Sequence, residues 1–489
     1  MVERNAHSKW SGRARHRSVG SAGVRAAMAL PALAAAMLLG GCMNLIPKYE
    51  RPAAPVAASY PAELTPASSA GATAAADIDW QAYFGDERLK RLIGISLNNN
   101  RDLRVAILNI EQARAAYQIK KADELPSLGA GFTANRAAGG SNGGLVNTYA
   151  VGLQVTSYEL DFFGRVRSLS QAALAQYLAT EEARKTVQIT LISSVANGYL
   201  SLLADDELLR VTRQALATRE DSFKLTKLKF DNGAASELDF RQAESLLEGA
   251  RVTLAQSLRQ RSLDENALVL LLGQPLPTDL PAPLPLQAQT MVPDLPAGLP
   301  SELLTRRPDV RSAEQQLLSA NANIGAARAA FFPRISLTAN AGTASTQLSG
   351  LFKSGTWALT GTGTLLQPLF DAGRNQANLD VAKVDRDIAV AQYEKAIQTA
   401  FREVSDSLAG RATLGEQVRA QAAQANALEV TYKLADLRYR NGAASYLDVL
   451  DAQRSLFTAQ QAVVQVQAAQ LQNLVTLYKV LGGGWTEPK

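Results

Sequence analysis

The chain has 489 residues, a single cysteine and a formal net charge of +5. All of that excess charge lies in residues 1–41, where six basic residues face one acidic residue, so the rest of the chain is neutral and gives no support for nucleic-acid binding. Both histidines, His7 and His16, lie there too. Without that segment the chain has no histidine and no cysteine besides Cys42. This excludes histidine-based catalysis, His/Cys zinc sites and disulfides, and we expect no enzyme.

Residues 1–41 are predicted to be a signal peptide. Four arginines between residues 13 and 25 precede the apolar run 26–39, which is too short and too rich in alanine for a stable membrane span. The segment ends in Leu-Gly-Gly-Cys42, which resembles the lipobox of bacterial lipoproteins. The resemblance implies cleavage before Cys42 and a covalent lipid on it, made of N-acyl and S-diacylglycerol groups; we expect no other cofactor. The alternative is a chance cysteine after an ordinary signal peptide.

Two segments rich in proline and small residues divide the rest of the chain. Residues 42–85 are predicted to be a lipidated tether or an equatorial strap with little core of its own, and residues 273–300 an equatorial linker. The first segment precedes a predicted repeat at 86–272, and the second separates it from a predicted repeat at 301–482. A short tail follows at 483–489.

The sequence NGAAS occurs twice, at residues 232–236 and 441–445, which lie 209 residues apart. Asparagine-glycine is a turn dipeptide because both residues tolerate a positive φ, and each copy interrupts long helical sequence. We therefore predict two helical hairpins, with tips at 231–236 and 440–445.

Each repeat is predicted to begin with a helix and to continue with two strands. The first helix is expected from Asp86 to Glu124, with a break near Asn98–Asn100 after which Asp102 caps the next helix. The second repeat starts with a helix from Ser301 to about Phe331. The strands, which alternate in polarity, are expected at about 127–136 and 148–158 and at about 335–343 and 357–366.

The strands have the length of tilted strands that cross a bilayer, although a soluble hairpin with one buried face is an alternative. Lipid cannot satisfy an open sheet edge, and four strands cannot close a barrel. The chain must therefore assemble, and a dimer, a trimer or a tetramer would supply eight, twelve or sixteen strands.

The hairpin helices are long. Residues 165–230 contain no proline and one glycine, which predicts a helix of about 100 Å, and residues 374–439 predict a second. We expect the return helices 236–272 and 301–331 to stack end to end as one column, and the helix 446–481 to stop half-way along the molecule.

The chain resembles the TolC-like outer-membrane factors, specifically the OprM-type (NodT-like) efflux lipoproteins. Nearly all of it after the signal peptide takes part in the resemblance. The motifs that carry it are Cys42, LDFFGR at 160–165, RRPDV at 306–310, FFPRISLTA at 331–339, LFDAGR at 369–374, both NGAAS tips and YLDVLDAQRSLFTAQQ at 446–461.

The resemblance implies an α+β membrane protein with four transmembrane β-strands per chain and long α-helical hairpins in two tandem repeats. Three chains would form a twelve-stranded β-barrel in the outer membrane, a periplasmic α-helical barrel and an equatorial domain. The homotrimer would be lipid-anchored in the outer membrane and extend into the periplasm.

By the same resemblance, the trimer would be the exit duct of a tripartite multidrug efflux pump. It would export antibiotics and other small toxic compounds passively, with a periplasmic membrane-fusion adaptor and an inner-membrane RND-type transporter as partners. One alternative is the same fold serving protein secretion or metal-ion efflux. The other is a trimeric lipid-anchored scaffold without a pore.

Two sets of residues are candidates for function. By the resemblance, the periplasmic gate consists of Leu447, Asp448, Asp451 and Arg454, and the adaptor docks on Gly233, Ser236, Gly442 and Ser445 at the tips. In a trimer, Asp448 and Asp451 of the three chains would give six carboxylates, which would favour the passage of cations. Bound cations could also block the channel there, although we expect no dedicated metal site. The alternatives are a solvated helix face and plain turns.

The first repeat departs from the gate pattern. Asp239 matches Asp448, but glutamine and serine, Gln242 and Ser245, stand where the second repeat has Asp451 and Arg454. The gate should therefore belong to the second hairpin.

Overall fold

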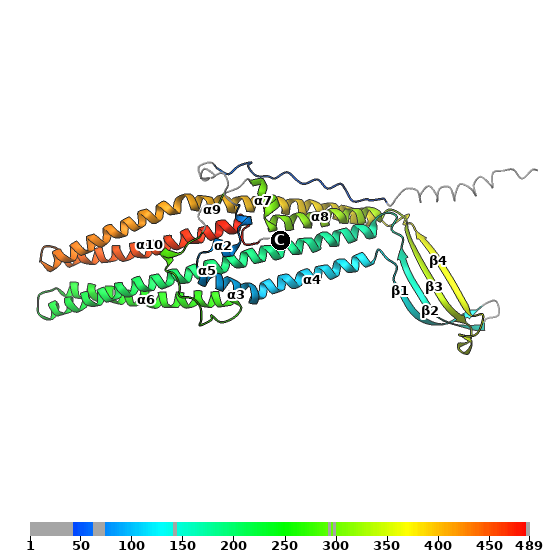
Figure 1. Cartoon of the computed structure of the whole chain (residues 1–489), viewed down its shortest axis with the longest axis horizontal. Helices are drawn as coiled ribbons and strands as arrows, with labels where there is room; N and C mark the ends of the chain where they lie inside the picture. The colour runs from blue at the N-terminus through cyan, green and yellow to red at the C-terminus, as the bar shows by residue number, and fades with distance from the viewer. Residues whose placement is uncertain (1–42, 62–73, 140–143, 292–294, 297–299, 486–489) are drawn as a thin grey trace, which may run out of the picture.

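The computed structural model describes residues 43–61, 74–139, 144–291, 295–296 and 300–485. The predicted signal peptide and Cys42 lie outside these residues. The molecule is elongated, with a β-sheet at one end and two helical tips at the other (Figure 1).

The chain consists of two repeats with the same order of elements, a helix, two strands and a long helical hairpin. The first comprises α3 (Glu87–Asn99), α4 (Arg101–Ala122), β1 (Leu128–Gly139), β2 (Gly144–Glu159), α5 (Arg165–Asp231) and α6 (Glu237–Leu272). The second comprises α7 (Pro300–Arg306), α8 (Pro308–Ala329), β3 (Arg334–Ser345), β4 (Trp357–Leu366), α9 (Arg374–Arg440) and α10 (Tyr446–Val480). Short elements complete the chain: η2 (Ala75–Asp77), α2 (Trp80–Tyr83), η3 (Leu286–Ala288) and η4 (Leu348–Gly350).

The two long helices agree closely with the prediction. Helices α5 and α9 each have 67 residues, which corresponds to about 100 Å. An 18-residue window of α5 is apolar enough to cross a membrane, but most of it is buried within the chain, as is usual for a core helix.

One prediction about the first helix was wrong. Asp102 does not cap α4; the cap is Asn100, whose side chain accepts a hydrogen bond from the backbone N–H of Leu103 at 3.0 Å. The N-cap side chain must lie just before the first helical residue to reach that group, and Asp102 already lies inside the helix.

The predicted stacking of the return helices was also wrong. The end of α6 meets the junction between α3 and α4, where Ser96 and Asn100 both donate to the carbonyl of Leu271 at 2.7 and 3.0 Å. The end of α10 meets the start of α8, where the buried Arg307 donates to the carbonyl of Val480 at 3.1 Å. Each column therefore joins helices from opposite ends of its own repeat, α6 with α4 and α10 with α8.

Arg307 explains the RRPDV motif. Its guanidinium lies 2.7 Å from Asp309 and 2.8 Å from Glu403, so it ties the start of α8 to α9 as well as to the end of α10.

The four strands form one antiparallel sheet in the order β1-β2-β3-β4. Phe132 pairs with Val151 and Leu359 with Ala341 on the apolar face, whose large side chains are largely exposed in the single chain. Asn340 pairs with Gln154 and with Thr360 on the other, polar face. This is the arrangement of a barrel wall with lipid on one side and an aqueous lumen on the other. The sheet leaves β1 and β4 as its unpaired edges.

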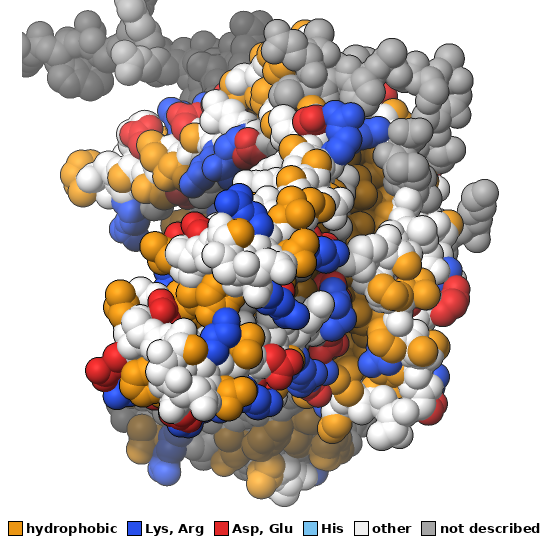
Figure 2. Space-filling view, turned by 90° about the vertical axis from the view of Figure 1, so that its left-hand side faces the viewer, with side chains coloured by type: hydrophobic (Ala, Val, Ile, Leu, Met, Phe, Trp, Pro, Cys, Tyr) orange, Lys and Arg blue, Asp and Glu red, His pale blue; other side chains and the backbone are white. Residues whose placement is uncertain are grey.

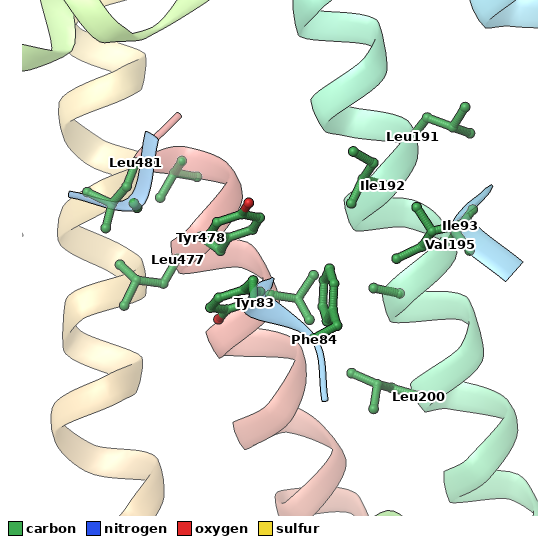
Figure 3. Close-up of a cluster of buried hydrophobic side chains, with 14 of the residues drawn as sticks. Tyr83, Phe84, Ile93, Leu191, Ile192, Val195, Leu200, Leu477, Tyr478 and Leu481 are labelled. Carbon is green, nitrogen blue, oxygen red and sulfur yellow. The ribbon is translucent and has the colours of Figure 1, made fainter. Parts of the chain in front are cut away.

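In the main core, Tyr83 and Phe84 from the segment before α3 pack with apolar side chains of α5 and α10 (Figure 3). Tyr83 and Tyr478 stack with ring centroids 4.0 Å apart. Tyr83 donates to the carbonyl of Leu474 at 2.8 Å and Tyr478 to that of Ile78 at 2.6 Å, so both buried hydroxyl groups are satisfied. These contacts join the segment before α3 to helix α10.

The carboxyl groups of Asp205 on α5 and Asp264 on α6 lie together without a cation between them. Asp205 is buried, and no donor among the described residues reaches its Oδ2. Arg261 pairs instead with Asp206 and Glu265, each at 2.6 Å. Burial first, and then Asp264, raise the pKa of Asp205 to about 7.

This pair predicts a pH-dependent stability. Because the folded pKa of Asp205 exceeds its unfolded value of about 4, the folded state keeps a proton that the unfolded state loses. We expect the melting temperature to fall as pH rises from about 4 to about 7, and the slope to be smaller in Asp205→Asn. Circular dichroism melts across this range provide the measurement. An unchanged slope in Asp205→Asn would contradict the assignment.

Candidate functional site

Both NGAAS segments form the same helix-to-helix turn, and both lie at the end of the molecule opposite the sheet (Figure 1). Gly233 has φ +71° and Gly442 φ +73°, a conformation that glycine adopts without strain. In the second tip, Gly442 donates to the carbonyl of Tyr439 at 3.0 Å and Ala443 to that of Arg438 at 2.8 Å. The first tip has the same pair of bonds. They satisfy the last carbonyls of the incoming helix.

The serine of each motif starts the outgoing helix. Ser236 and Asp239 form a capping box at the start of α6, and Ser445 and Asp448 form its copy at the start of α10. The Asp448 carboxylate accepts from the Ser445 backbone N–H at 3.0 Å and from its hydroxyl at 2.9 Å. The predicted turns are confirmed, and the glycine, the first alanine and the serine of the motif each have a local structural role.

The tips nevertheless leave room for a partner. A Cβ built on Gly233 or Gly442 would meet no atom within 4 Å. Seen end-on, this end of the molecule mixes basic and acidic side chains with apolar ones (Figure 2). Leu238 and Leu447, which occupy matching places in the two tips, are 65% and 50% exposed. Docking at Gly233, Ser236, Gly442 and Ser445 stays a prediction.

The predicted gate residues lie on the exposed face of the first turns of α10. Asp451 and Arg454 form an ion pair at 3.6 Å, and both side chains are more than half exposed. Asp448 is occupied by the capping box one turn earlier. Within one chain, therefore, Arg454 pairs with Asp451, and Asp448 serves the helix start in the same way as Asp239.

The opposite face of α10 holds the second hairpin against the first. Tyr446, Val449 and Leu450 are buried with Ala243 and Leu246 of α6 in a small cluster separate from the main core.

Farther along α10, a polar contact reinforces this packing. The buried Gln453 donates to Ser222 of α5 at 3.2 Å and to Tyr432 of α9 at 3.4 Å. Movement of the gate would have to break these contacts.

One residue beside this interface is absent from the predicted site. Arg219 of α5 is 7% exposed and lies over the ring of Phe457, 4.9 Å from its centroid. The surrounding sequence, RQALATREDSF at 213–223, is typical of a solvated helix face, so it carries no signal that Arg219 is buried.

Residues 43–61 run along the molecule from the sheet towards the main core. The backbone N–H of Met43 donates to the carbonyl of Phe162 at 3.1 Å, where the sheet meets α5. Farther along, Tyr49 and Arg51 both bind Glu314 of α8, at 2.9 and 2.8 Å. The predicted strap is therefore fixed along α8, and the residue after Cys42 lies at the junction of sheet and helices.

A family described as "Outer membrane efflux protein" matches residues 92–274 and 299–483. The chain belongs to the outer membrane efflux protein family. The chain is 48% identical over 462 residues to the antibiotic efflux pump outer membrane protein ArpC of Pseudomonas putida, which covers 92% of this chain and 94% of ArpC. It is 45% identical over 468 residues to outer membrane protein OprJ of Pseudomonas aeruginosa, covering 94% and 97%.

Solved structures of outer-membrane proteins resemble this chain along most of its length. A membrane protein from Pseudomonas aeruginosa superimposes with a TM-score of 0.84 at 44% identity, covering 91% of this chain and 99% of that one. The open state of the MtrE outer membrane channel of Neisseria gonorrhoeae gives 0.82 at 41% identity, covering 90% and 98%. This efflux protein is thus an outer-membrane channel component rather than an enzyme, as predicted. In the part of the chain that the structure describes, no group of three metal-ligating residues could hold an ion.

Proposed function

We propose that three copies of this efflux protein form the exit duct of a tripartite pump. The observation that carries the proposal is the four-stranded sheet with two unpaired edges, mounted on helices of about 100 Å. Pairing β1 of one copy with β4 of the next removes every edge, and three copies give the twelve strands expected from the resemblance. The helices would continue the lumen through the periplasm, where a membrane-fusion adaptor and an RND-type transporter would complete the pump.

The proposed cargo is small, mostly apolar toxic compounds. Relatives at 47–48% identity are named as efflux proteins for antibiotics, toluene and solvents. The test is deletion of the gene in its host. We expect lower inhibitory concentrations for several such compounds and recovery when the gene is restored. Unchanged inhibitory concentrations for all of them would contradict the proposal.

We also propose that Cys42 carries the lipid. Met43 is fixed at the junction of the sheet and the helices, so an acyl chain on the preceding residue would enter the same membrane that the strands would cross. In Cys42→Ala, incorporation of labelled palmitate should fall to background, because the chain has no other cysteine to acylate. The variant should still assemble, since the strap is held by α8. Label retained in Cys42→Ala would contradict the assignment.

Adaptor docking at the tips predicts a loss of efflux in Gly442→Glu. Any side chain at this positive φ costs about 1–2 kcal/mol, and a bulky charged one also fills the open space above the turn. Drug susceptibility should approach that of the deletion strain, while the protein remains assembled.

Two controls separate docking from strain. Gly442→Ala adds the backbone strain without the bulk and should keep most of the activity. Gly355→Glu lies in the β3–β4 connection, has φ +87° and equally open surroundings, and should have little effect. Full activity in Gly442→Glu would exclude this tip from docking.

A further inference from the structure

The two repeats meet within the sheet, where β2, the last strand of the first repeat, pairs with β3, the first strand of the second. In this β2–β3 joint, Val155 lies opposite Ala339. Just after β2, the backbone N–H of Leu160 donates to the carbonyl of Ile335 at 2.8 Å, which continues the pairing towards the helices. The chain therefore contains one complete example of how consecutive repeats join.

The strand pairs of the two repeats are equivalent. Val155 lies opposite Leu128 in the first repeat, and Leu365 lies opposite Ile335 in the second. Leu128 and Ile335 each come two residues after a proline, which makes them equivalent positions, and their partners Val155 and Leu365 are equivalent in turn. Each strand residue of one repeat can therefore be assigned its counterpart in the other.

The first repeat contains one extra residue between this position and its long helix. Gly164 follows Val155 after nine positions, whereas Gly373 follows Leu365 after eight. The extra residue forms the bulge in β2 between Val155 and Tyr158. Strand β4 lacks this residue, so β4 can pair without interruption along its free edge.

The corresponding joint at the outer edges of the sheet has only one side in a single chain (Figure 1). By its distance from the glycine that precedes the long helix, Leu369 is the counterpart of Leu160. Leu369 and Phe370 are 94% and 90% exposed, the highest values for large apolar side chains in the part of the chain that the structure describes. Leu128, the counterpart of Ile335, is 68% exposed. A second copy of the chain would supply the strand that each of these residues lacks.

We propose that the β2–β3 joint is the template for the joints between copies, so that β4 of one copy pairs with β1 of the next in the same register. Leu365 then lies opposite Phe132 of the next copy, because Phe132 is the counterpart of Ala339. The backbone N–H of Leu369 donates to the carbonyl of Leu128 of that copy. This rests on the proposed barrel and adds the register of its joints.

The side chains agree with this register. On the polar face of the sheet, Thr364 lies opposite Thr133 of the next copy and Thr362 opposite Asn135, and such polar pairs stabilise neighbouring strands. A slip of one residue would bring polar side chains of β4 beside apolar side chains of β1. A slip of two residues keeps the faces, so only the template distinguishes it, and the test must separate these registers.

The test is disulfide cross-linking of full-length protein in four double-cysteine variants that share the same four positions. The matched pairs are Thr364→Cys with Thr133→Cys and Thr362→Cys with Asn135→Cys. The crossed pairs are Thr364→Cys with Asn135→Cys and Thr362→Cys with Thr133→Cys. All four side chains are exposed in the single chain. Within one chain, β1 and β4 lie three strand spacings or about 14 Å apart, so every disulfide must join two copies.

In outer-membrane vesicles treated with a mild oxidant, we expect the matched pairs to form covalent species of more than one chain. The crossed pairs should form at least about tenfold less of them, because diagonal neighbours lie roughly 7–8 Å apart, beyond the reach of a disulfide. The four single-cysteine variants, which keep Cys42, give the background. Each introduced cysteine occurs in one matched and one crossed variant, so a difference in reactivity or folding at one position cannot produce the expected pattern.

Stronger cross-linking in a crossed pair than in the matched pairs would overturn the register and leave the closed barrel intact. Equal cross-linking in all four variants, or none in any of them while unheated gels still show the oligomer, would overturn it as well. The proposed duct fails instead if the wild type itself migrates as a single chain on those gels.

Discussion

Asp451→Asn is expected to make cells that carry the efflux protein sensitive to antibiotics too large for their porins. The carboxylate balances Arg454 at 3.6 Å on the exposed face of α10, and three copies would place three such pairs around one axis. Losing the charge would remove a ring of carboxylates at the proposed constriction and would leave three uncompensated arginines. The inhibitory concentration of a large antibiotic should fall about fivefold or more, the size of an ordinary coupling between two states of a protein.

Asp448→Asn is the control for this experiment. Asp448 lies three residues away, but its carboxylate accepts both hydrogen bonds from Ser445 and caps α10. Its replacement should cost roughly 1 kcal/mol of local stability. The Asp448→Asn channel should admit much less antibiotic than the Asp451→Asn channel. If Asp448→Asn leaks as much as Asp451→Asn, both carboxylates belong to the gate, as the sequence resemblance suggested. If neither leaks, the gate lies elsewhere.

Gly342→Val is expected to abolish assembly of the heat-stable oligomer. Gly342 pairs with Gly152 across β2 and β3, and a Cβ on either residue would collide with the backbone of the opposite strand. Overpacking costs about 1–3 kcal/mol where side chains can move aside, and here the obstacle is the main chain itself. The strands should separate at the place where the two repeats join. Unheated gel electrophoresis of outer-membrane extracts would report the loss of the oligomer.

Gly361→Val provides the matched comparison. Gly361 also lies in the sheet, on β4, but a Cβ there would meet no atom within 4 Å. This variant should assemble like the wild type. A normal oligomer in Gly342→Val would show that β2 and β3 can move apart without loss of the barrel, contrary to the register described here.

Much of this fold could be predicted because its signals are local. The two 67-residue helices follow from the absence of proline. NGAAS, together with the aspartate three residues after its serine, ends one helix, turns the chain and starts the next. The alternating strands were found within a few residues of their actual ends. The joining of the columns was missed because it depends on contacts between distant segments, such as Asn100 with Leu271, that leave no periodic signal.

In the candidate site, too, features set by local sequence could be predicted and those set by distant contacts could not. The repeat pointed to the turn at Gly442 and the helix start at Ser445 because these roles are local. The predicted docking at Gly442 and Ser445 and the gate role of Asp448 stay predictions. Arg219 was missed because α5 has neighbours on several sides and no clear polar face, so a buried arginine cannot be told from a solvated one. Its surroundings exist only once α10 packs on α5.

Three copies of the efflux protein are proposed to close one barrel through β1 and β4. The most direct test is disulfide cross-linking, with one cysteine introduced in β1 (Leu128–Gly139) and one in β4 (Trp357–Leu366) at several relative registers. The chain suits this test, because its own single cysteine is Cys42. At the matching register, we expect covalent species of two and three chains and none larger. A ladder that stops at two chains, one that continues past three, or no cross-link at any register would contradict the account.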